Sequence, residues 1–232
     1  MVARTLFLGA FALILRLDDV HGHAKLVEPP ARNAMWRFGY DTPEDLDDAG
    51  LYCGGFSTQW KKNGGRCGPC GDAFSHPTPR PHETGGLYGK NITVRTYPPD
   101  ADVDVVVDIT SNHMGWFQFS LCQRDSVNQL ETEDCFHYHL PILTEEGAVY
   151  RYVLPTSRGG LYLFKVKLPR DVTCNHCILR WEWIAGHTVG RCKDGKQRLG
   201  CGPQETYRNC ADIAIRSGGG VRGPLAANGL EK

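Results

Sequence analysis

The chain has no surplus of charge of either sign and only one long apolar run. Its 232 residues include 26 Lys and Arg and 26 Asp and Glu, so the formal net charge is zero. Without a basic surplus, the chain is not expected to bind nucleic acid or anionic lipid through bulk charge. The apolar run covers residues 6–15, whereas a membrane span needs about 20 apolar residues. We therefore expect no transmembrane anchor.

The apolar run belongs to an N-terminal stretch with the layout of a secretory signal. Arg4 precedes it, and Val20 and Gly22 are small enough for the −3 and −1 positions of a cleavage site. Residues 1–22 are therefore predicted to be a removed signal peptide, and the mature protein is predicted to be secreted. It would begin at His23, whose free α-amine and imidazole could chelate one metal ion.

Ten cysteines follow the leader. An even number in a secreted chain indicates disulfide bonds, although the sequence leaves their connectivity open. Two Cys-x-x-Cys pairs, Cys67/Cys70 and Cys174/Cys177, would indicate a zinc site in a cytosolic protein. Behind a secretory leader, disulfides are the favoured interpretation.

The distribution of turn-forming residues predicts one domain with a loop-rich first part and a strand-rich second part. Proline and paired glycines interrupt the chain up to about residue 89, apart from short helical turns expected near residues 34–38. Beyond it, β-branched and aromatic residues predict strands and hence a β-sandwich. The predicted strands are residues 91–97, 103–109, 116–122, 149–154, 161–168, 178–184 and 210–215. The domain is expected to cover residues 23–216, and residues 217–232 to form a glycine-rich disordered tail.

Asn91-Ile92-Thr93 is a glycosylation sequon.

Among the nine histidines, His113 has the most suggestive position. It follows the predicted strand 103–109 and precedes another, so it would lie at a strand end on rigid support. His137 and His139 alternate and form a weaker metal pair. The remaining histidines after the leader and His23 are expected to be surface or structural residues: His76, His82, His176 and His187.

Several sequence blocks together resemble a known family. They are His23-Ala24-Lys25-Leu26-Val27-Glu28-Pro29-Pro30-Ala31-Arg32, Met35-Trp36-Arg37-Phe38-Gly39, Cys53-Gly54-Gly55, Cys67-Gly68-Pro69-Cys70-Gly71-Asp72, Asn112-His113 with Gly115, Cys201-Gly202-Pro203-Gln204-Glu205 and Tyr207-Arg208-Asn209-Cys210-Ala211-Asp212-Ile213. The chain resembles the lytic polysaccharide monooxygenases of the auxiliary-activity family found in insects, other invertebrates and some viruses.

This resemblance implies a copper site on an immunoglobulin- or fibronectin III-like β-sandwich. His23 would bind copper through its amine and a ring nitrogen, His113 would supply a third nitrogen, and Tyr207 would be axial. Such a nitrogen set suits Cu(II). Glu182 is a candidate for positioning an oxygen species beside the metal, although strand alternation equally allows it to face solvent.

The implied reaction is oxidative cleavage of an insoluble polysaccharide by a monomeric enzyme. Copper would use an external reductant and O₂ or H₂O₂ to hydroxylate C1 or C4 of a glycosidic linkage. Chitin is the first choice of substrate and cellulose the second, and Trp36, Tyr52 or Phe56 could contact the polymer.

Two other functions fit a secreted β-sandwich. One is a non-catalytic polysaccharide-binding module. The other is a glycosidase with two carboxylates, for which the sequence identifies no pair at the required separation of about 5–10 Å.

Overall fold

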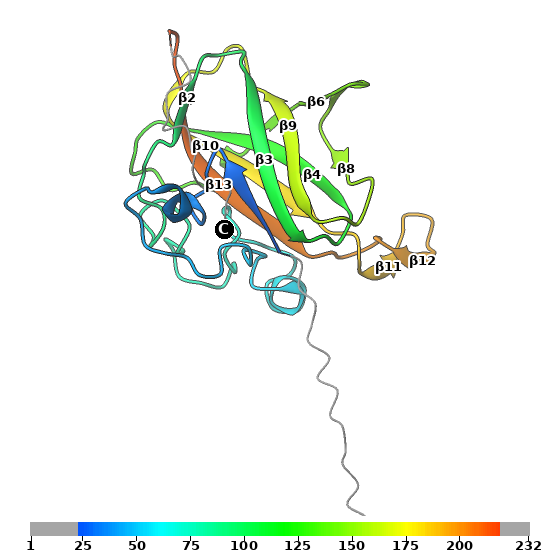
Figure 1. Ribbon diagram of the computed structural model, residues 1–232. Coiled ribbons are helices and arrows are strands. Elements are labelled where there is room, and N and C mark those ends of the chain that lie inside the picture. The colour runs from blue at the N-terminus through cyan, green and yellow to red at the C-terminus, as the bar shows by residue number, and fades with distance from the viewer. Residues whose placement is uncertain (1–22, 219–232) are drawn as a thin grey trace, which may run out of the picture.

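A computed structural model of the protein describes residues 23–218, which form two packed β-sheets (Figure 1). One sheet has the order β1-β3-β9-β6-β7, and the other has the order β2-β13-β10-β4-β5, with β8 also paired to β4. A separate two-stranded hairpin is formed by β11 and β12. The strands are β1 (His23–Glu28), β2 (Arg95–Tyr97), β3 (Asp102–Ser111), β4 (Trp116–Arg124), β5 (Tyr138–Leu140), β6 (Ile142–Thr144), β7 (Gly147–Val149), β8 (Tyr152–Val153), β9 (Gly160–Lys167), β10 (Cys174–Ile184), β11 (Val189–Arg191), β12 (Gln197–Leu199) and β13 (Thr206–Ile215). The helical turns are η1 (Met35–Phe38), η2 (Ser57–Lys62) and η3 (Glu133–Cys135).

Alternating side chains on β3 explain how the first sheet faces the second. Val103, Val105, Val107 and Ile109 are buried, whereas the aspartates between them are exposed or half-buried. A strand with one apolar and one polar face covers a core on one side and meets water on the other. The core between the sheets also contains Phe117 and the indoles of β10.

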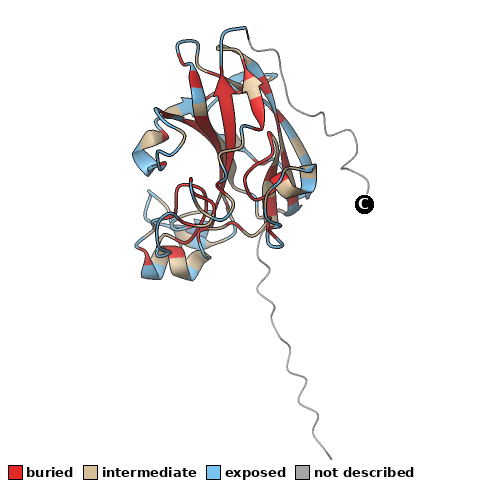
Figure 2. Cartoon of the chain, turned by 90° about the vertical axis from the view of Figure 1, so that its left-hand side faces the viewer, coloured by how far each residue is buried: buried red, intermediate tan, exposed pale blue. Residues whose placement is uncertain are grey.

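The strand β10 is buried on both faces, as the red ribbon in Figure 2 illustrates for the central strands. Its odd-numbered residues from Cys177 to Trp183 belong to the core between the sheets. Ile178 lies on the other face and packs with Cys70 and Cys210 in a second apolar cluster. This outer cluster exists because the long N-terminal loops cover part of that face (Figure 1).

Buried polar groups and disulfides hold these loops against the sheet. Arg32 donates two hydrogen bonds of 2.7 Å to the Asp212 carboxylate on β13 and also pairs with buried Glu131. All ten cysteines are in disulfides, as expected. The pairs are Cys53–Cys67, Cys70–Cys210, Cys122–Cys135, Cys174–Cys177 and Cys192–Cys201. No free thiol remains for the zinc site considered above.

The β-sandwich prediction is confirmed, and the turn near residues 34–38 is the short helix η1. Sequence patterns did not predict β1, the short strands β5 and β6, or the β11–β12 hairpin. The expected signal peptide and most of the expected tail lie outside the described residues. Within residues 23–218, no helix has the length and apolar character of a membrane span.

Candidate metal centre

His113 lies in a tightly held turn between β3 and β4. The Asn112 amide donates hydrogen bonds to the carbonyls of Thr156 and Arg158, at 3.2 and 2.8 Å. Gly115 has a φ of +87°, and a Cβ there would lie 1.9 Å from the Ile184 carbonyl oxygen. Only glycine fits this close approach of two backbones, so the turn that presents His113 is fixed by its neighbours.

Two backbone hydrogen bonds bring the ends of other strands to this turn. The Gly186 N–H donates to the His113 carbonyl at 2.9 Å, and the Ala185 N–H donates to the Glu205 carbonyl at 3.0 Å. The segment after β10 therefore lies between the His113 turn and the residue that precedes β13. As a result, His187 and Glu205 meet His113 at one end of the sandwich.

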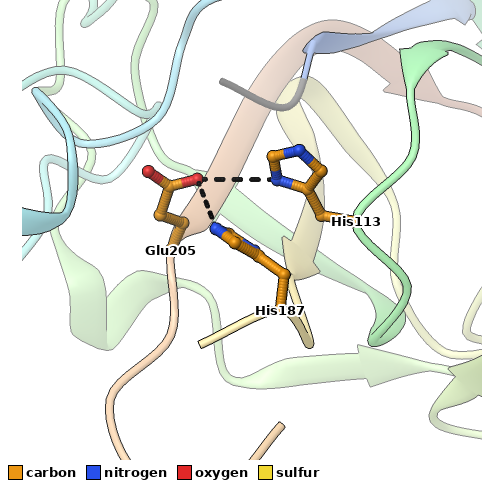
Figure 3. Close-up of side chains that lie close together, drawn as sticks. All are labelled: His113, His187 and Glu205. Atoms are coloured by element: carbon orange, nitrogen blue, oxygen red, sulfur yellow. Dashed lines mark ion pairs between the residues drawn. The ribbon is translucent and has the colours of Figure 1, made fainter. Parts of the chain in front are cut away.

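The three side chains form a compact group of possible metal ligands (Figure 3). The Glu205 Oε2 lies 3.9 Å from His113 Nδ1 and 3.7 Å from His187 Nε2. The two imidazole rings have centroids 4.1 Å apart. Within residues 23–218, no other group of three or more histidine, cysteine or carboxylate side chains has this geometry. His137 and His139 are exposed and belong to no such group.

Tyr207 joins the group from the core side. Its hydroxyl donates a 3.3 Å hydrogen bond to Glu205 Oε2, and its ring stacks on Trp183 and Tyr52 at centroid distances of 4.8 and 5.7 Å. Burial, together with the nearby Glu205 carboxylate, raises the pKa of Tyr207 far above its ordinary value. The phenol is therefore neutral and keeps its proton in the hydrogen bond to the carboxylate.

His23 begins β1 at the same end of the molecule. It is opposite Ser111 in the β1–β3 ladder, two residues before His113. The Thr110 hydroxyl donates a 3.2 Å hydrogen bond to the His23 carbonyl, and the next amide, of Ala24, donates to Ala49 at 3.1 Å. These bonds fix the backbone at the start of β1 beside the end of β3.

Glu182 is not brought to this group. Its carboxylate pairs with Arg208 at 2.6 Å and accepts a hydrogen bond from Gln118. Adjacent residues of a strand face opposite sides of the sheet, and Trp183 is the neighbour that faces Tyr207. Glu182 thus lies on the outer face of the sheet, away from the Tyr207 side.

The carboxylate beside the histidines is Glu205, which sequence reasoning did not single out. Its spacing of two residues from Tyr207 was the available signal, because alternate residues share one side of an extended chain.

His187 was expected to be a surface or structural residue, and it is indeed exposed. Its place beside His113 depends on the contact of Gly186 with the His113 turn, which no local pattern reveals.

Comparison with known proteins identifies relatives of this chain. The family model described as lytic polysaccharide mono-oxygenase, cellulose-degrading, matches residues 21–213. The structure of a lytic polysaccharide monooxygenase AA15 from Thermobia domestica in the Cu(I) state is 48% identical, with a TM-score of 0.80, over 83% of this chain and 98% of that chain. A chitin binding domain from Burkholderia pseudomallei is 10% identical, with a TM-score of 0.48, over 84% of this chain and 100% of that chain. No curated protein sequence matches.

The side chains at this end of the sandwich suit the cofactor of this family. Imidazole nitrogens are good copper ligands, and nitrogen and oxygen ligands together are typical of Cu(II) sites. The family match spans most of the chain, and the AA15 structure matches it in both sequence and fold. The chain therefore belongs to the lytic polysaccharide monooxygenases of the AA15 type, which are copper enzymes that cleave polysaccharides oxidatively with O₂ or H₂O₂ and a reductant.

Proposed function

We propose that His23, His113 and Tyr207 hold the copper ion after residues 1–22 have been removed. His23 would contribute its new α-amine and its ring, His113 one ring nitrogen, and Tyr207 its phenolic oxygen. The observation that carries this proposal is the pairing of His23 with Ser111. Because of this pairing, a chain that begins at His23 would begin beside the His113 turn. The common contact of His113 and Tyr207 with Glu205 supports it.

The surrounding residues prepare the ligands for this role. Because His113 Nδ1 faces Glu205, Nε2 is the nitrogen that would meet the metal. Carboxylates that contact a metal-binding histidine orient the ring and increase its basicity. We therefore assign to Glu205, rather than Glu182, the role of the nearby positioning carboxylate. Bound copper would supply the one-electron chemistry that activates the oxygen co-substrate.

The proposed reaction is hydroxylation at C1 or C4 of a glycosidic linkage in an insoluble polymer. Chitin is the favoured substrate because of the resemblance to animal-type members of the family, and cellulose is the alternative. Trp36, Tyr52 and Phe56 are all half-exposed, so each retains some surface for contact with a polymer. Of these, Tyr52 stacks on Tyr207 and therefore contacts one of the proposed ligands.

We also propose that the protein is secreted as a monomer and carries a glycan at Asn91. Family members are generally extracellular, and five disulfides suit an oxidising compartment. Asn91 is half-buried, and its side-chain oxygen Oδ1 accepts a 3.3 Å hydrogen bond from Arg124.

Copper titration of the processed protein tests the ligand assignment. His113→Ala removes one proposed nitrogen ligand, so the dissociation constant for Cu(II) should rise by about two orders of magnitude or more, since structural metal–ligand bonds are worth several kcal/mol. His187→Ala is the matched control, because it removes a neighbouring imidazole that is not a proposed ligand; it should change the affinity much less. An unchanged affinity in His113→Ala, or an equal loss in both variants, would contradict the assignment.

A further inference from the structure

Two adjoining clefts lie on the outer face of the sheet that contains β13, β10 and β4. One cleft, of about 290 Å³, is lined by residues that include Trp60, Trp116, Glu182 and Arg208. The other, of about 330 Å³, is lined by Gln118, His139, Tyr150 and Arg151. A hydrogen bond from Gln118 to Glu182 joins the two linings, and the Arg151 guanidinium lies 4.3 Å above the Trp116 ring. We call this combined feature the outer groove.

Two indole rings of the outer groove, those of Trp60 and Trp116, are held by neighbouring residues. The Trp60 indole N–H donates a 2.8 Å hydrogen bond to the Gln204 carbonyl. Gly65 lies directly against this ring, because a Cβ at that position would be 2.7 Å from it. Trp116 is opposite Ile184 in the β4–β10 ladder. Both indoles are half-exposed, so each offers a fixed apolar surface with a polar edge.

At the centre of the outer groove, acidic and basic side chains pair with each other, so their charges nearly cancel. Buried Glu182 pairs with Arg208 at 2.6 Å, and Arg208 also pairs with Glu133 at 2.8 Å. Burial raises the pKa of Glu182, but the charges of Arg208 and Arg180 outweigh burial and lower it, so the carboxylate is ionised. Together with the Gln118 amide, these groups offer several donors and acceptors beside the rings. A neutral ligand with both hydroxyl groups and apolar ring faces would match this lining.

The outer groove lies on the opposite side of the chain from the proposed metal ligands. Gln204, Thr206 and Arg208 line it, whereas the intervening Glu205 and Tyr207 face the histidine group. A ligand in the outer groove would therefore leave the proposed copper site accessible. It would also bind within a few residues of that site along the same strand.

We propose that the outer groove is a second carbohydrate-binding site, which takes a short length of a single neutral β-linked oligosaccharide chain. Aromatic rings would stack on the apolar faces of the sugars, and the Gln118, Glu182 and Arg208 side chains would bind hydroxyl or acetamido groups. This proposal rests on the proposed function for the choice of a neutral β-linked polymer. The site would bind a loosened or released chain while the copper end of the molecule meets the solid.

Indole N–H resonances provide a direct test in the copper-free, processed protein. Titration with chitohexaose, and separately with cellohexaose, should shift the resonances of Trp60 and Trp116. The resonances of Trp181 and Trp183, which are buried between the sheets, should stay in place. Shifts absent with both sugars at millimolar concentration would overturn the proposal. Shifts that follow protein concentration alone would assign the groove to contact between copies of the chain and would also overturn it.

Variants separate this site from the copper site. Trp116→Ala should weaken oligosaccharide binding about tenfold or more, as expected for removal of an aromatic anchor. Arg151→Ala, a milder change at an exposed residue, should also alter the affinity. Leu163→Ala, at an exposed apolar residue of the other sheet, is the control and should have no effect. Equal affinity in all three variants would overturn the proposal. Because binding is measured without copper, loss of oxidised products in His113→Ala tests the proposed function separately.

Discussion

Glu205 contacts three side chains at the metal centre. Its Oε2 lies 3.3 Å from the Tyr207 hydroxyl, 3.7 Å from His187 Nε2 and 3.9 Å from His113 Nδ1. It is buried, and a buried carboxylate must be compensated by nearby donors. These contacts couple the orientation of Tyr207, a proposed ligand, to that of His113, a proposed histidine ligand.

The substitution Glu205→Gln tests this coupling. It keeps the shape of the side chain but removes its charge, so copper affinity should fall by about 10- to 100-fold, as for other residues that support metal-bound histidines. Glu182→Gln is the matched control on the opposite side of the sheet. It should lower thermal stability, because it breaks the buried pair with Arg208, and leave copper affinity nearly unchanged. Copper titration and thermal unfolding measure both effects, and a larger affinity loss in Glu182→Gln would refute the role given to Glu205.

His82 shows a different use of a histidine in the same fold. Its two ring nitrogens lie 2.9 Å from Asp72 and 3.0 Å from Asp45, and Tyr88 stacks on the ring. Burial alone would lower the pKa of His82, but hydrogen bonds to Asp45 and Asp72 and their charges outweigh burial and raise it. The imidazole joins two parts of the long loop region through these contacts, so the expectation of a structural role is met.

This shift predicts how stability depends on pH. A raised pKa means that His82 stabilises the fold fully below the ordinary imidazole pKa of about 6.5 and loses this contribution as pH rises through the higher folded value. The free energy of unfolding of wild type should therefore decrease, relative to that of His82→Gln, between pH 6 and the alkaline range. Unfolding in denaturant across this range measures the difference. Parallel pH profiles would show that protonation of His82 contributes nothing to the free energy of unfolding. If His82→Gln does not fold, the NMR titration of His82 in wild type still tests the raised pKa.

At the scale of strands and loops, the sequence predicted what depends on local alternation. The apolar positions of β3 recur at every second residue, so its location and buried face were predictable. The short strand β6 (Ile142–Thr144) has too few residues to show a pattern. The β11–β12 hairpin is exposed and polar or glycine-rich, with isolated apolar residues at Val189 and Leu199. Neither element carries a periodic signal.

The metal centre was predictable only where a motif or a resemblance identified a residue. His113 stood out at a strand end, and the resemblance proposed His23 and Tyr207. Glu205 and His187 come from segments whose meeting depends on backbone hydrogen bonds between distant turns. Glu182 was a reasonable candidate by residue type, but the strand register determines which face it occupies.

Two disulfides of very different span give a prediction about the loop region. Cys70–Cys210 joins residues 140 apart and ties the loops to β13, whereas Cys174–Cys177 joins residues three apart. The chain-entropy model gives about 5 kcal/mol for the long loop and about 2 kcal/mol for the short one. The Cys70→Ala/Cys210→Ala double variant should therefore lose more stability than Cys174→Ala/Cys177→Ala. Chemical denaturation of both compares them directly, and the reverse order would contradict this account of loop attachment.

At the scale of the whole molecule, the β-sandwich holds the proposed ligands at one end. β1 brings His23, the turn after β3 brings His113, and β13 brings Tyr207, so that three elements distant in sequence meet there. Two sheets with a packed aromatic core provide a rigid base for this meeting. The long loops cover part of the outer face of the sheet that contains β13, β10 and β4. They leave the outer groove open beside β13.

The proposed mechanism of oxidative polysaccharide cleavage requires copper held by an N-terminal His23. Its most direct test is mass spectrometry of products released from chitin and cellulose by two copper-treated forms, one beginning at His23 and one that retains Gly22 before it. With a reductant and an oxygen co-substrate, the form that begins at His23 should release chains with oxidised C1 or C4 ends, and the extended form should release few or none. Products without oxidised ends, or equal oxidation by both forms, would contradict the claim.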